Sequence, residues 1–420
     1  MTIPSPLQRL TSDAWLLFAT RFIRLFAYGS LSVVLVFYLV GVGLSEPQTG
    51  MLLTLTLVGD TVVSLFLTTR ADRIGRRRML VVGAVLMVAA GLVFASTRNL
   101  WLLVLAGTVG VISPSGNEVG PFLSIEQAAL SQAVTDRSRT EVFAWYTLTG
   151  SLATALGALA GGTATRVLQE TVMAPVSSYR MVVILYAVLG VILVVLFSRL
   201  SRAAEAPVLG ERNASSRATF AGLSGLDRSR NVVVKLSALF ALDSFGGGFV
   251  VQSLAAYWFY LRFGVNPQTL GAIFFWANIF AGISALLASR LASRFGLIKT
   301  MVATHLPSNI LLILVPLMPT LSLAVVVLLL RFSISQMDVP TRQSYIMAVV
   351  SPDERSAAAG ITGVARTAGA AISPLFVGFM FARPALINLP FFIAGILKIT
   401  YDLLLYRAFV AVQPPEETKR

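Results

Sequence analysis

Long apolar runs separated by short polar stretches make up most of the chain. Twelve such runs can be marked, and each is close to or longer than the roughly 20 residues that a helix needs to cross a bilayer. They lie at about 14–41, 47–69, 79–97, 100–133, 140–165, 179–199, 233–262, 267–290, 298–317, 320–350, 356–382 and 386–408. The pattern predicts an all-α membrane protein with twelve transmembrane helices.

Composition supports the same class. Apolar residues form 56% of the chain and charged residues 12%, against about 25% charged in a soluble domain, and the mean hydropathy is +0.80. With no cysteine and one histidine, the sequence offers no disulfide framework, metal cluster or catalytic triad. We therefore expect no enzyme activity, no cofactor and no metal.

The net charge of +14 is explained by where the cations lie. If the N-terminus is cytoplasmic, the cytoplasmic segments hold 21 of the 33 Lys and Arg residues and the outer loops hold 5. By the positive-inside rule this predicts that both termini are cytoplasmic, in a plasma or bacterial inner membrane. The charge then reflects orientation and contact with anionic lipid, and nucleic-acid binding is not expected.

One long segment, 200–231, breaks the apolar pattern with five arginines among Ala, Ser and Gly. We interpret it as a cytoplasmic linker between two six-helix bundles, 1–199 and 232–420. The two bundles show weak similarity to each other. A shift of 216 residues places Gln127 on Gln343 and Arg139 on Arg355, and a shift of 221 places Arg73-Ile74-Gly75 on Arg294-Phe295-Gly296. These matches indicate a duplicated six-helix unit.

A basic loop between the second and third runs carries the clearest motif, Asp72-Arg73-Ile74-Gly75-Arg76-Arg77-Arg78. It resembles the loop between helices two and three of the major facilitator superfamily of secondary transporters, although Thr68 stands where that family usually has Gly. The resemblance implies two six-helix bundles related by a pseudo-twofold axis. It also implies that Asp72, Arg73, Gly75 and Arg76 are conformational residues that stabilise the outward-open state.

A second, degenerate motif lies in the fifth run. Gly157-Ala158-Leu159-Ala160-Gly161-Gly162 resembles the fifth-helix signature of the drug–proton antiporter branch, with Ala158 in place of its Pro. Close packing between helices through small residues would explain the same pattern.

Charged residues inside the apolar runs are the candidate functional residues, because an ionisable group in hydrocarbon costs at least about 2.5–3.5 kcal/mol. In the resembling family, helices one, four, seven and ten line the central cavity. We take Arg24, Glu118, Asp243 and Arg331 as substrate-binding candidates, and Glu118 and Asp243 also as proton carriers. Further gating candidates are Arg21, Glu126, Arg139, Asp338, Arg342 and Arg355.

Several of these charges are expected to pair locally. Arg331, Asp338 and Arg342 would share one stripe of a continuous helix. Glu126 is expected to pair with Arg137 or Arg139. Lys398 and Asp402, four residues apart, would neutralise each other, and His305 is expected to be a packed or interfacial residue rather than a proton relay.

The sequence thus predicts a monomeric secondary transporter that moves a small solute through the bilayer by alternating access, driven by protons or another coupling ion. The arginines favour an organic anion or zwitterion as substrate. A proton-driven multidrug exporter of cationic compounds is the main alternative. A non-transporting receptor or scaffold is a minor one.

Overall fold

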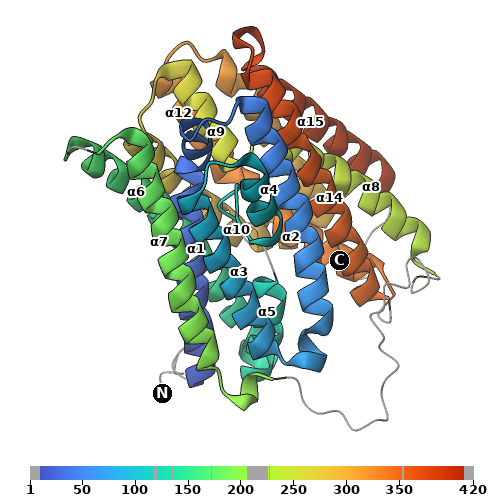
Figure 1. Cartoon of the computed structure of the whole chain (residues 1–420). Helices are drawn as coiled ribbons and strands as arrows, with labels where there is room; N and C mark the ends of the chain where they lie inside the picture. The colour runs from blue at the N-terminus through green and yellow to red at the C-terminus, as the bar shows by residue number, and fades with distance from the viewer. Residues whose placement is uncertain are drawn as a thin grey trace, which may run out of the picture. The chain divides into compact units, whose positions relative to one another are not determined.

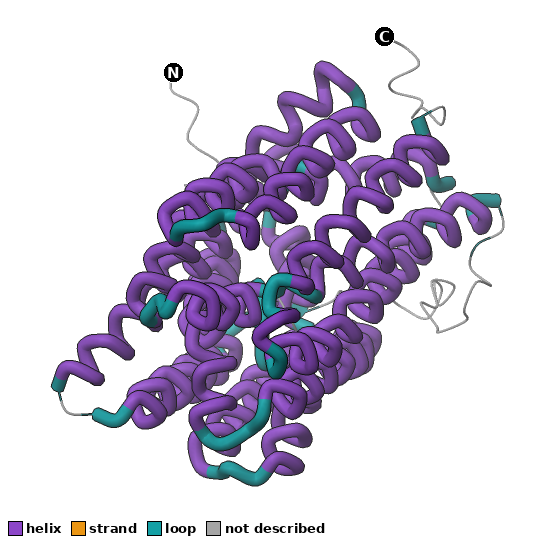
Figure 2. Tube along the Cα trace, turned by 90° about the horizontal axis from the view of Figure 1, so that it is seen from above, coloured by secondary structure: helices purple, strands orange, loops and turns teal. Residues whose placement is uncertain are grey.

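The structure is a computed structural model that describes residues 10–117, 121–134, 136–171, 173–205, 226, 228–351 and 354–410. Within these ranges the side chains at positions 72, 133, 136–141, 289 and 356 lie outside the description. All regular secondary structure in the described part is helical (Figure 2). The all-α architecture predicted from the sequence is confirmed.

The first group of helices precedes the long polar segment (Figure 1). It comprises α1 (Ser12–Gly41), α2 (Glu46–Ile74), α3 (Arg76–Ser96), α4 (Leu100–Val109), α5 (Phe122–Ala133), α6 (Asp136–Glu170), α7 (Pro175–Ser198) and the 3₁₀ turn η2 (Arg202–Ala204). The second group comprises α8 (Arg230–Gly248), α9 (Gln252–Phe263), α10 (Pro267–Phe295), α11 (Leu297–Leu314), η5 (Val315–Leu317), α12 (Leu321–Ser335), α13 (Asp338–Val349), α14 (Arg355–Phe381), η6 (Pro384–Leu386) and α15 (Leu389–Phe409).

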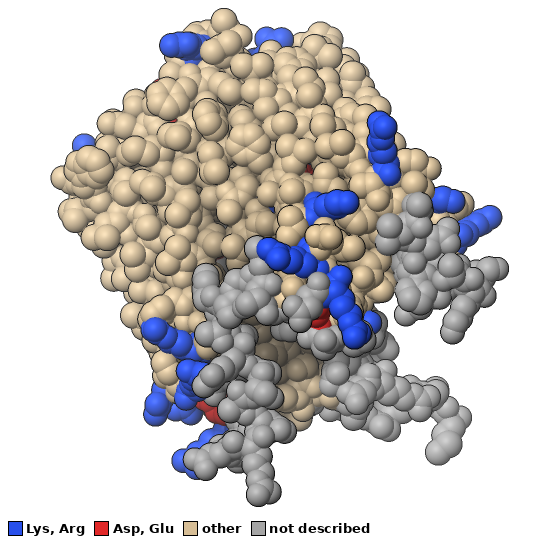
Figure 3. Space-filling model, turned by 90° about the vertical axis from the view of Figure 1, so that its right-hand side faces the viewer, with Lys and Arg blue, Asp and Glu red and all other residues tan. Residues whose placement is uncertain are grey.

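In the described residues, eleven helical segments are long and apolar enough to cross a membrane. Many of their large apolar side chains are exposed, for example Val62 at 62% and Ile396 at 59%, which suits a surface that faces lipid. The face drawn in Figure 3 agrees, since most of it is uncharged and few carboxylates reach it.

The fourth expected span, 100–133, is not one continuous helix. Within it α4 and α5 are helical, and the described backbone between them, at 110–117 and 121, is irregular, with φ of 57° at Val111 and 68° at Gly116. Two other expected spans are also broken, between Gly248 and Gln252 and between Ser335 and Asp338. The glycine run Gly246-Gly247-Gly248 explains the first of these breaks, because glycine weakens a helix.

Contacts divide the chain into two compact units. Unit 1 contains Met1–Asn213 and Gln252–Phe275, and unit 2 contains Ala214–Val251 and Trp276–Arg420. The most extensive helix pairs are α1–α6 and α3–α7 in unit 1, and α8–α14 and α11–α15 in unit 2. The pair α9 and the start of α10, which the sequence analysis placed in the C-terminal bundle, therefore packs within unit 1.

The internal repeat is visible in how these helix pairs pack. In α1–α6, Gly29 lies so close to the carbonyl of Thr154 that no Cβ fits, and in α8–α14, Gly248 lies equally close to the carbonyl of Ala370. The corresponding residues are 219 apart in α1 and α8 and 216 apart in α6 and α14. A shift of 216 also maps α5 onto α13, as expected from Gln127 and Gln343.

The outer helix pairs repeat in the same way. Gly190 of α7 packs against Val88 of α3, and Gly395 of α15 packs against Asn309 of α11. The shifts are 205 residues for α7 to α15 and 221 for α3 to α11. The shift of 221 also relates Gly75 and Gly296, which both precede a helix with positive φ, at 116° and 87°. These shifts define counterparts in unit 2 for the residues of α1, α3, α5, α6 and α7.

Candidate functional site

A buried ion pair lies at the centre of unit 1. The two terminal nitrogens of Arg24 on α1 each donate to one carboxylate oxygen of Glu126 on α5, both at 2.7 Å, and neither side chain is exposed. Thr20 donates to the same carboxylate at 3.0 Å, and the hydroxyl of Tyr146 on α6 donates to its other oxygen. Glu126 therefore ties three helices together.

Close to this pair, a polar network surrounds the irregular backbone between α4 and α5. The carbonyl of Gly116 accepts from Thr154 at 3.2 Å, and Gln252 of α9 donates to Ser32 of α1 at 2.8 Å. The backbone N–H of Ser253 donates to the carbonyl of Pro114 at 3.1 Å. Non-helical backbone at membrane depth is tolerated where it is buried in protein or lines a cavity, so this segment is a second candidate region.

Unit 2 holds a larger cluster around Asp243 of α8. The ammonium of Lys398 on α15 donates to Asp243 Oδ1 at 2.6 Å, and Arg342 on α13 donates to Oδ2 at 3.2 Å. His305 Nε2 on α11 lies 3.7 Å from Oδ1. One buried carboxylate thus meets three basic groups, each from a different helix.

The same cluster contains two more carboxylates. Asp338 lies 3.2 Å from the Arg342 guanidinium, one turn away on α13. Asp402 on α15 contacts His305 Nδ1 at 2.8 Å and accepts from Asn309 at 2.9 Å. Desolvated charges of this kind stabilise a structure only when each has a partner, and here every carboxylate named has one.

The structure therefore gathers five of the sequence candidates into two groups. Arg24 and Glu126 meet in unit 1, and Asp243, Asp338 and Arg342 meet in unit 2. Arg21 lies beside the first group, with its guanidinium carbon 4.4 Å from the Tyr146 ring centroid.

Other candidates lie apart from the two groups. Arg331 forms no ion pair with a described residue, its Nε has no hydrogen-bond partner there, and its guanidinium lies 5.1 Å from the Phe332 ring centroid. Glu118 lies outside the described residues, as do the side chains of Asp72 and Arg139.

The predicted loop residues surround the turns between helices. Gly75 forms the turn between α2 and α3, Arg73 is exposed, and the N–H groups of Arg76 and Arg77 donate to Glu205 at 2.5 and 3.3 Å. Arg355 begins α14, directly after Glu354. These contacts satisfy N–H groups that the first turn of a helix leaves without a partner.

Two expected arrangements are wrong. Lys398 and Asp402 do not neutralise each other, because Lys398 binds Asp243 and Asp402 binds His305. Glu126 binds Arg24 of α1, and its expected pairing with Arg137 or Arg139 lies outside the described side chains. Arg331 does not share a continuous helix with Asp338, since the helix ends at Ser335.

Sequence reasoning also missed the importance of three residues. From the sequence, His305 is expected to be a packed residue, and neither Asn309 nor Tyr146 is named as a candidate. In the structure His305 and Asn309 contact Asp402, and Tyr146 donates to Glu126. The spacing of His305 and Asn309 by four residues, on an apolar helix, was the available signal.

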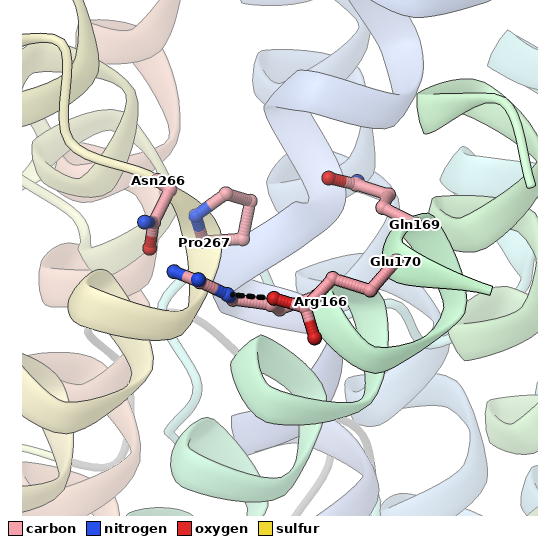
Figure 4. A pocket seen from close by; sticks show the side chains of 5 residues that line it. All are labelled: Arg166, Gln169, Glu170, Asn266 and Pro267. Atoms are coloured by element: carbon pink, nitrogen blue, oxygen red, sulfur yellow. Dashed lines mark hydrogen bonds and ion pairs between the residues drawn. The ribbon is translucent and has the colours of Figure 1, made fainter. Parts of the chain in front are cut away.

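One surface hollow of about 270 Å³ lies at helix ends in unit 1 (Figure 4). It is lined by Arg166, Gln169 and Glu170 of α6 and by Asn266 and Pro267 at the start of α10. Arg166 donates to Glu170 at 2.7 Å, and both side chains are about half exposed. Because its charges neutralise each other at the surface, the buried clusters are the better candidate site.

Comparison with known proteins identifies the family that shares this architecture. The family description Major Facilitator Superfamily matches residues 17–332 and, in a second match, 236–420. The chain belongs to the major facilitator superfamily. An uncharacterized membrane protein of Saccharomyces cerevisiae, YJR124C, is 32% identical over 424 residues, which cover 95% of this chain and 94% of that protein.

Solved structures of the superfamily share the fold. The D-xylose–proton symporter has a TM-score of 0.70 at 15% identity and covers 94% of this chain and 97% of its own. The nucleoside transporter NupG has a TM-score of 0.68 at 16% identity, with coverage of 96% and 99%. The human organic anion transporter MFSD10 has a TM-score of 0.63 at 15% identity, with coverage of 96% and 100%. This superfamily member is thus a multi-pass membrane protein with the fold of secondary transporters.

Proposed function

We propose that this superfamily member is a proton-coupled secondary transporter that moves a small solute by alternating access. The observation that supports this best is the position of Asp243, which binds Lys398, Arg342 and, more distantly, His305 from three other helices. A change of charge at any of these groups alters the contacts between α8, α11, α13 and α15. Ionisable networks inside a membrane are typical of proton pathways.

The arginines of the clusters are relevant to which chemical class of substrate the protein binds. Arg24 and Arg342 already bind carboxylates, so they are available to a substrate only if Glu126, Asp243 or Asp338 releases them. Arg331 has no such partner among the described residues, and a guanidinium can grip a carboxylate or phosphate with two parallel hydrogen bonds. We therefore propose an organic anion or zwitterion as substrate, with Arg331 as its first binding residue. Glu118 is a further candidate substrate-binding residue, from the sequence alone.

Export of cationic drugs is the alternative. Its support in the sequence was the segment Gly157–Gly162, but Gly157 and Gly161 lie directly against the carbonyls of Phe26 and Ser30 on α1. This contact favours close packing as the reason for the small residues. A cation exporter would also need an acid without a bound cation, which neither Glu126 nor Asp243 provides.

The remaining features of the proposal follow the family resemblance and the charge census. Asp72, Arg73, Gly75, Arg76, Arg139 and Arg355 act at the cytoplasmic ends of helices and control the exchange between conformations. The protein acts as a monomer with both termini in the cytoplasm.

The test is transport in proteoliposomes with a pH gradient imposed across the membrane. The probes are 6-carboxyfluorescein as an organic anion and ethidium as a cationic dye. We expect gradient-dependent flux of the anion that falls at least tenfold in Arg331→Ala, while Arg166→Ala, which removes an exposed arginine, keeps the wild-type rate.

The outcomes separate the alternatives. Flux that ignores the pH gradient contradicts proton coupling. Ethidium transport that survives Arg331→Ala but is lost in Asp243→Asn favours the multidrug exporter. The last outcome is that neither probe is transported, and that the protein does not raise the flux of a wider set of anions and cations above that of protein-free vesicles. This outcome contradicts the transporter proposal for these solute classes.

A further inference from the structure

His305, the single histidine of the chain, lies buried between two carboxylates. Its Nδ1 is 2.8 Å from Asp402 Oδ1, and its Nε2 is 3.7 Å from Asp243 Oδ1. Asn309, one turn further along α11, donates to the second oxygen of Asp402 at 2.9 Å and so holds that carboxylate in place.

A neutral imidazole cannot satisfy both neighbours. It carries one N–H and one lone pair. If Nδ1 lacks the proton, it can accept from the Asn309 amide 3.1 Å away, but the ring then offers no donor to Asp402. If Nε2 lacks the proton, its lone pair faces Asp243. Only the charged imidazolium, with an N–H on each side, presents a donor to both Asp402 and Asp243. A protonated ring therefore has a donor for each of the two carboxylates, whereas a neutral ring has a donor for only one of them.

Other charged groups complete the environment of the ring. Asp243 comes from α8, and the cluster around it also holds Asp338 and Arg342 of α13 and Lys398, Tyr401 and Asp402 of α15. Arg331 of α12 and Arg366 of α14 interact electrostatically with Asp243. The helices packed against α11 also carry Tyr345 on α13 and Tyr406 and Arg407 on α15. The four cations Arg331, Arg342, Arg366 and Lys398 exceed the three carboxylates Asp243, Asp338 and Asp402 by one charge when the imidazole is neutral. The charge state of His305 then decides whether the cluster carries one or two net positive charges.

The internal repeat shows that the polar group His305, Lys398 and Asp402 occurs in unit 2 and that the corresponding positions of unit 1 are apolar. The counterpart of the Asp243–Arg342 pair is Arg24–Glu126, so both units hold a buried ion pair at the same place, with the charges exchanged. The counterparts of His305, Lys398 and Asp402 are Ala84, Leu193 and Phe197, which are fully buried and apolar. The fold is therefore stable with apolar residues at these three positions.

We propose that His305 is the residue that binds the coupling proton, with Asp402 and Asn309 as the residues that position its ring. This inference rests on the proposed function, since it names the group that would carry the proton. In the structure Lys398 donates to Asp243 Oδ1 at 2.6 Å. Proton uptake at Nε2 supplies a second donor to that oxygen.

The proton thereby changes which helices are held together. The imidazolium competes with the Lys398 ammonium for one oxygen, so the link from α8 to α11 strengthens as the link from α8 to α15 weakens. The helix that carries Asp243 ends five residues later, at Gly248. A change at this oxygen is therefore made close to the break between α8 and α9.

The test uses the fact that one histidine gives one set of imidazole signals. Protein with ¹⁵N-labelled histidine is studied by NMR in lipid nanodiscs between about pH 5 and 9. We expect the ring nitrogens to change from the neutral to the charged pattern, with a midpoint that differs between the wild type and Asp402→Asn, because the variant lacks the carboxylate beside Nδ1. Glu170→Gln, which removes an exposed carboxylate of unit 1, leaves the midpoint unchanged.

A ring that keeps one charge state over the whole range overturns the inference, as does a midpoint that is the same in Asp402→Asn and in the wild type. A flux assay then separates this inference from the proposed function. If His305→Gln abolishes accumulation of carboxyfluorescein driven by a pH gradient but preserves its exchange between the two sides, both hold. If accumulation persists in His305→Gln, the coupling proton binds elsewhere, whereas the proposal of proton coupling stands.

Discussion

At the scale of single residues, each unit contains a buried ion pair, and the charges of the two pairs are exchanged. Each unit buries an arginine and a carboxylate, as Arg24–Glu126 between α1 and α5 in unit 1 and as Asp243–Arg342 between α8 and α13 in unit 2. The first pair has two parallel hydrogen bonds and no exposed surface. The second shares its carboxylate with Lys398, so it has more than one way to stay neutral. We conclude that the pair in unit 1 is the more rigid of the two.

Removal of one partner from this rigid pair gives a clear prediction. Glu126→Ala leaves the Arg24 guanidinium buried without its carboxylate, which costs about 3–5 kcal/mol. We expect a fall in the thermal unfolding temperature of the detergent-purified protein, measured by size-exclusion chromatography after heating.

Two further variants make this prediction falsifiable. The double variant Arg24→Leu, Glu126→Leu removes both charges and should recover most of the lost stability. Glu170→Ala, which breaks the exposed pair with Arg166, should change stability by less than about 1 kcal/mol. Equal losses in Glu126→Ala and the double variant would show that the pair itself does not matter.

At the scale of helices, glycines set how closely the pairs approach. A Cβ at Gly29 would collide with the carbonyl of Thr154, whereas a Cβ at Gly363 of α14 would meet no other atom within 4 Å. Backbone contact of this kind lets two helices pack without a large side chain between them. The α1–α6 and α8–α14 pairs depend on it.

Substitution at these two glycines should therefore have opposite effects. Gly29→Ala forces α1 and α6 apart and should destabilise the protein by about 1–3 kcal/mol. Gly363→Ala adds no clash and should be neutral or stabilise the helix by up to about 1 kcal/mol, since alanine is the better helix former. Unfolding temperatures of the two variants measured side by side check this, and a harmless Gly29→Ala would contradict the packing argument.

The same scale shows why sequence reasoning succeeded in part. Apolar run length predicts which segments are helical, and the glycines at 75 and 296 mark turns that the structure confirms through their positive φ. The breaks within runs, and the partner of each buried charge, depend on distant residues. Asp243 and Lys398 are 155 positions apart, so no local spacing reveals that they bind each other.

At the scale of the whole molecule, the predicted orientation can be tested because the chain has no cysteine. Single cysteines placed at exposed positions of helix ends act as reporters. Ser96→Cys, before the predicted outer loop, should react with a membrane-impermeant maleimide in intact cells. Ala203→Cys, after α7, should react only once the membrane is opened.

The labelling result at each of the two sites also serves as the experimental control for the other site. The opposite pattern of labelling would reverse the orientation that the 21 to 5 distribution of Lys and Arg predicts. Labelling of both sites in intact cells would contradict an odd number of crossings between them. Neither outcome would alter the family, which rests on the match along the chain.

The exchanged charges of the two buried pairs also bear on the history of the chain. A gene duplication copies an ion pair with its polarity unchanged, so Arg24–Glu126 and Asp243–Arg342 cannot both be direct copies of one ancestral pair. Reversal by single steps would bury two like charges together, which is strongly unfavourable. At least one pair was therefore acquired after duplication, from a copy that was uncharged at these positions, and the two halves have evolved their electrostatics separately.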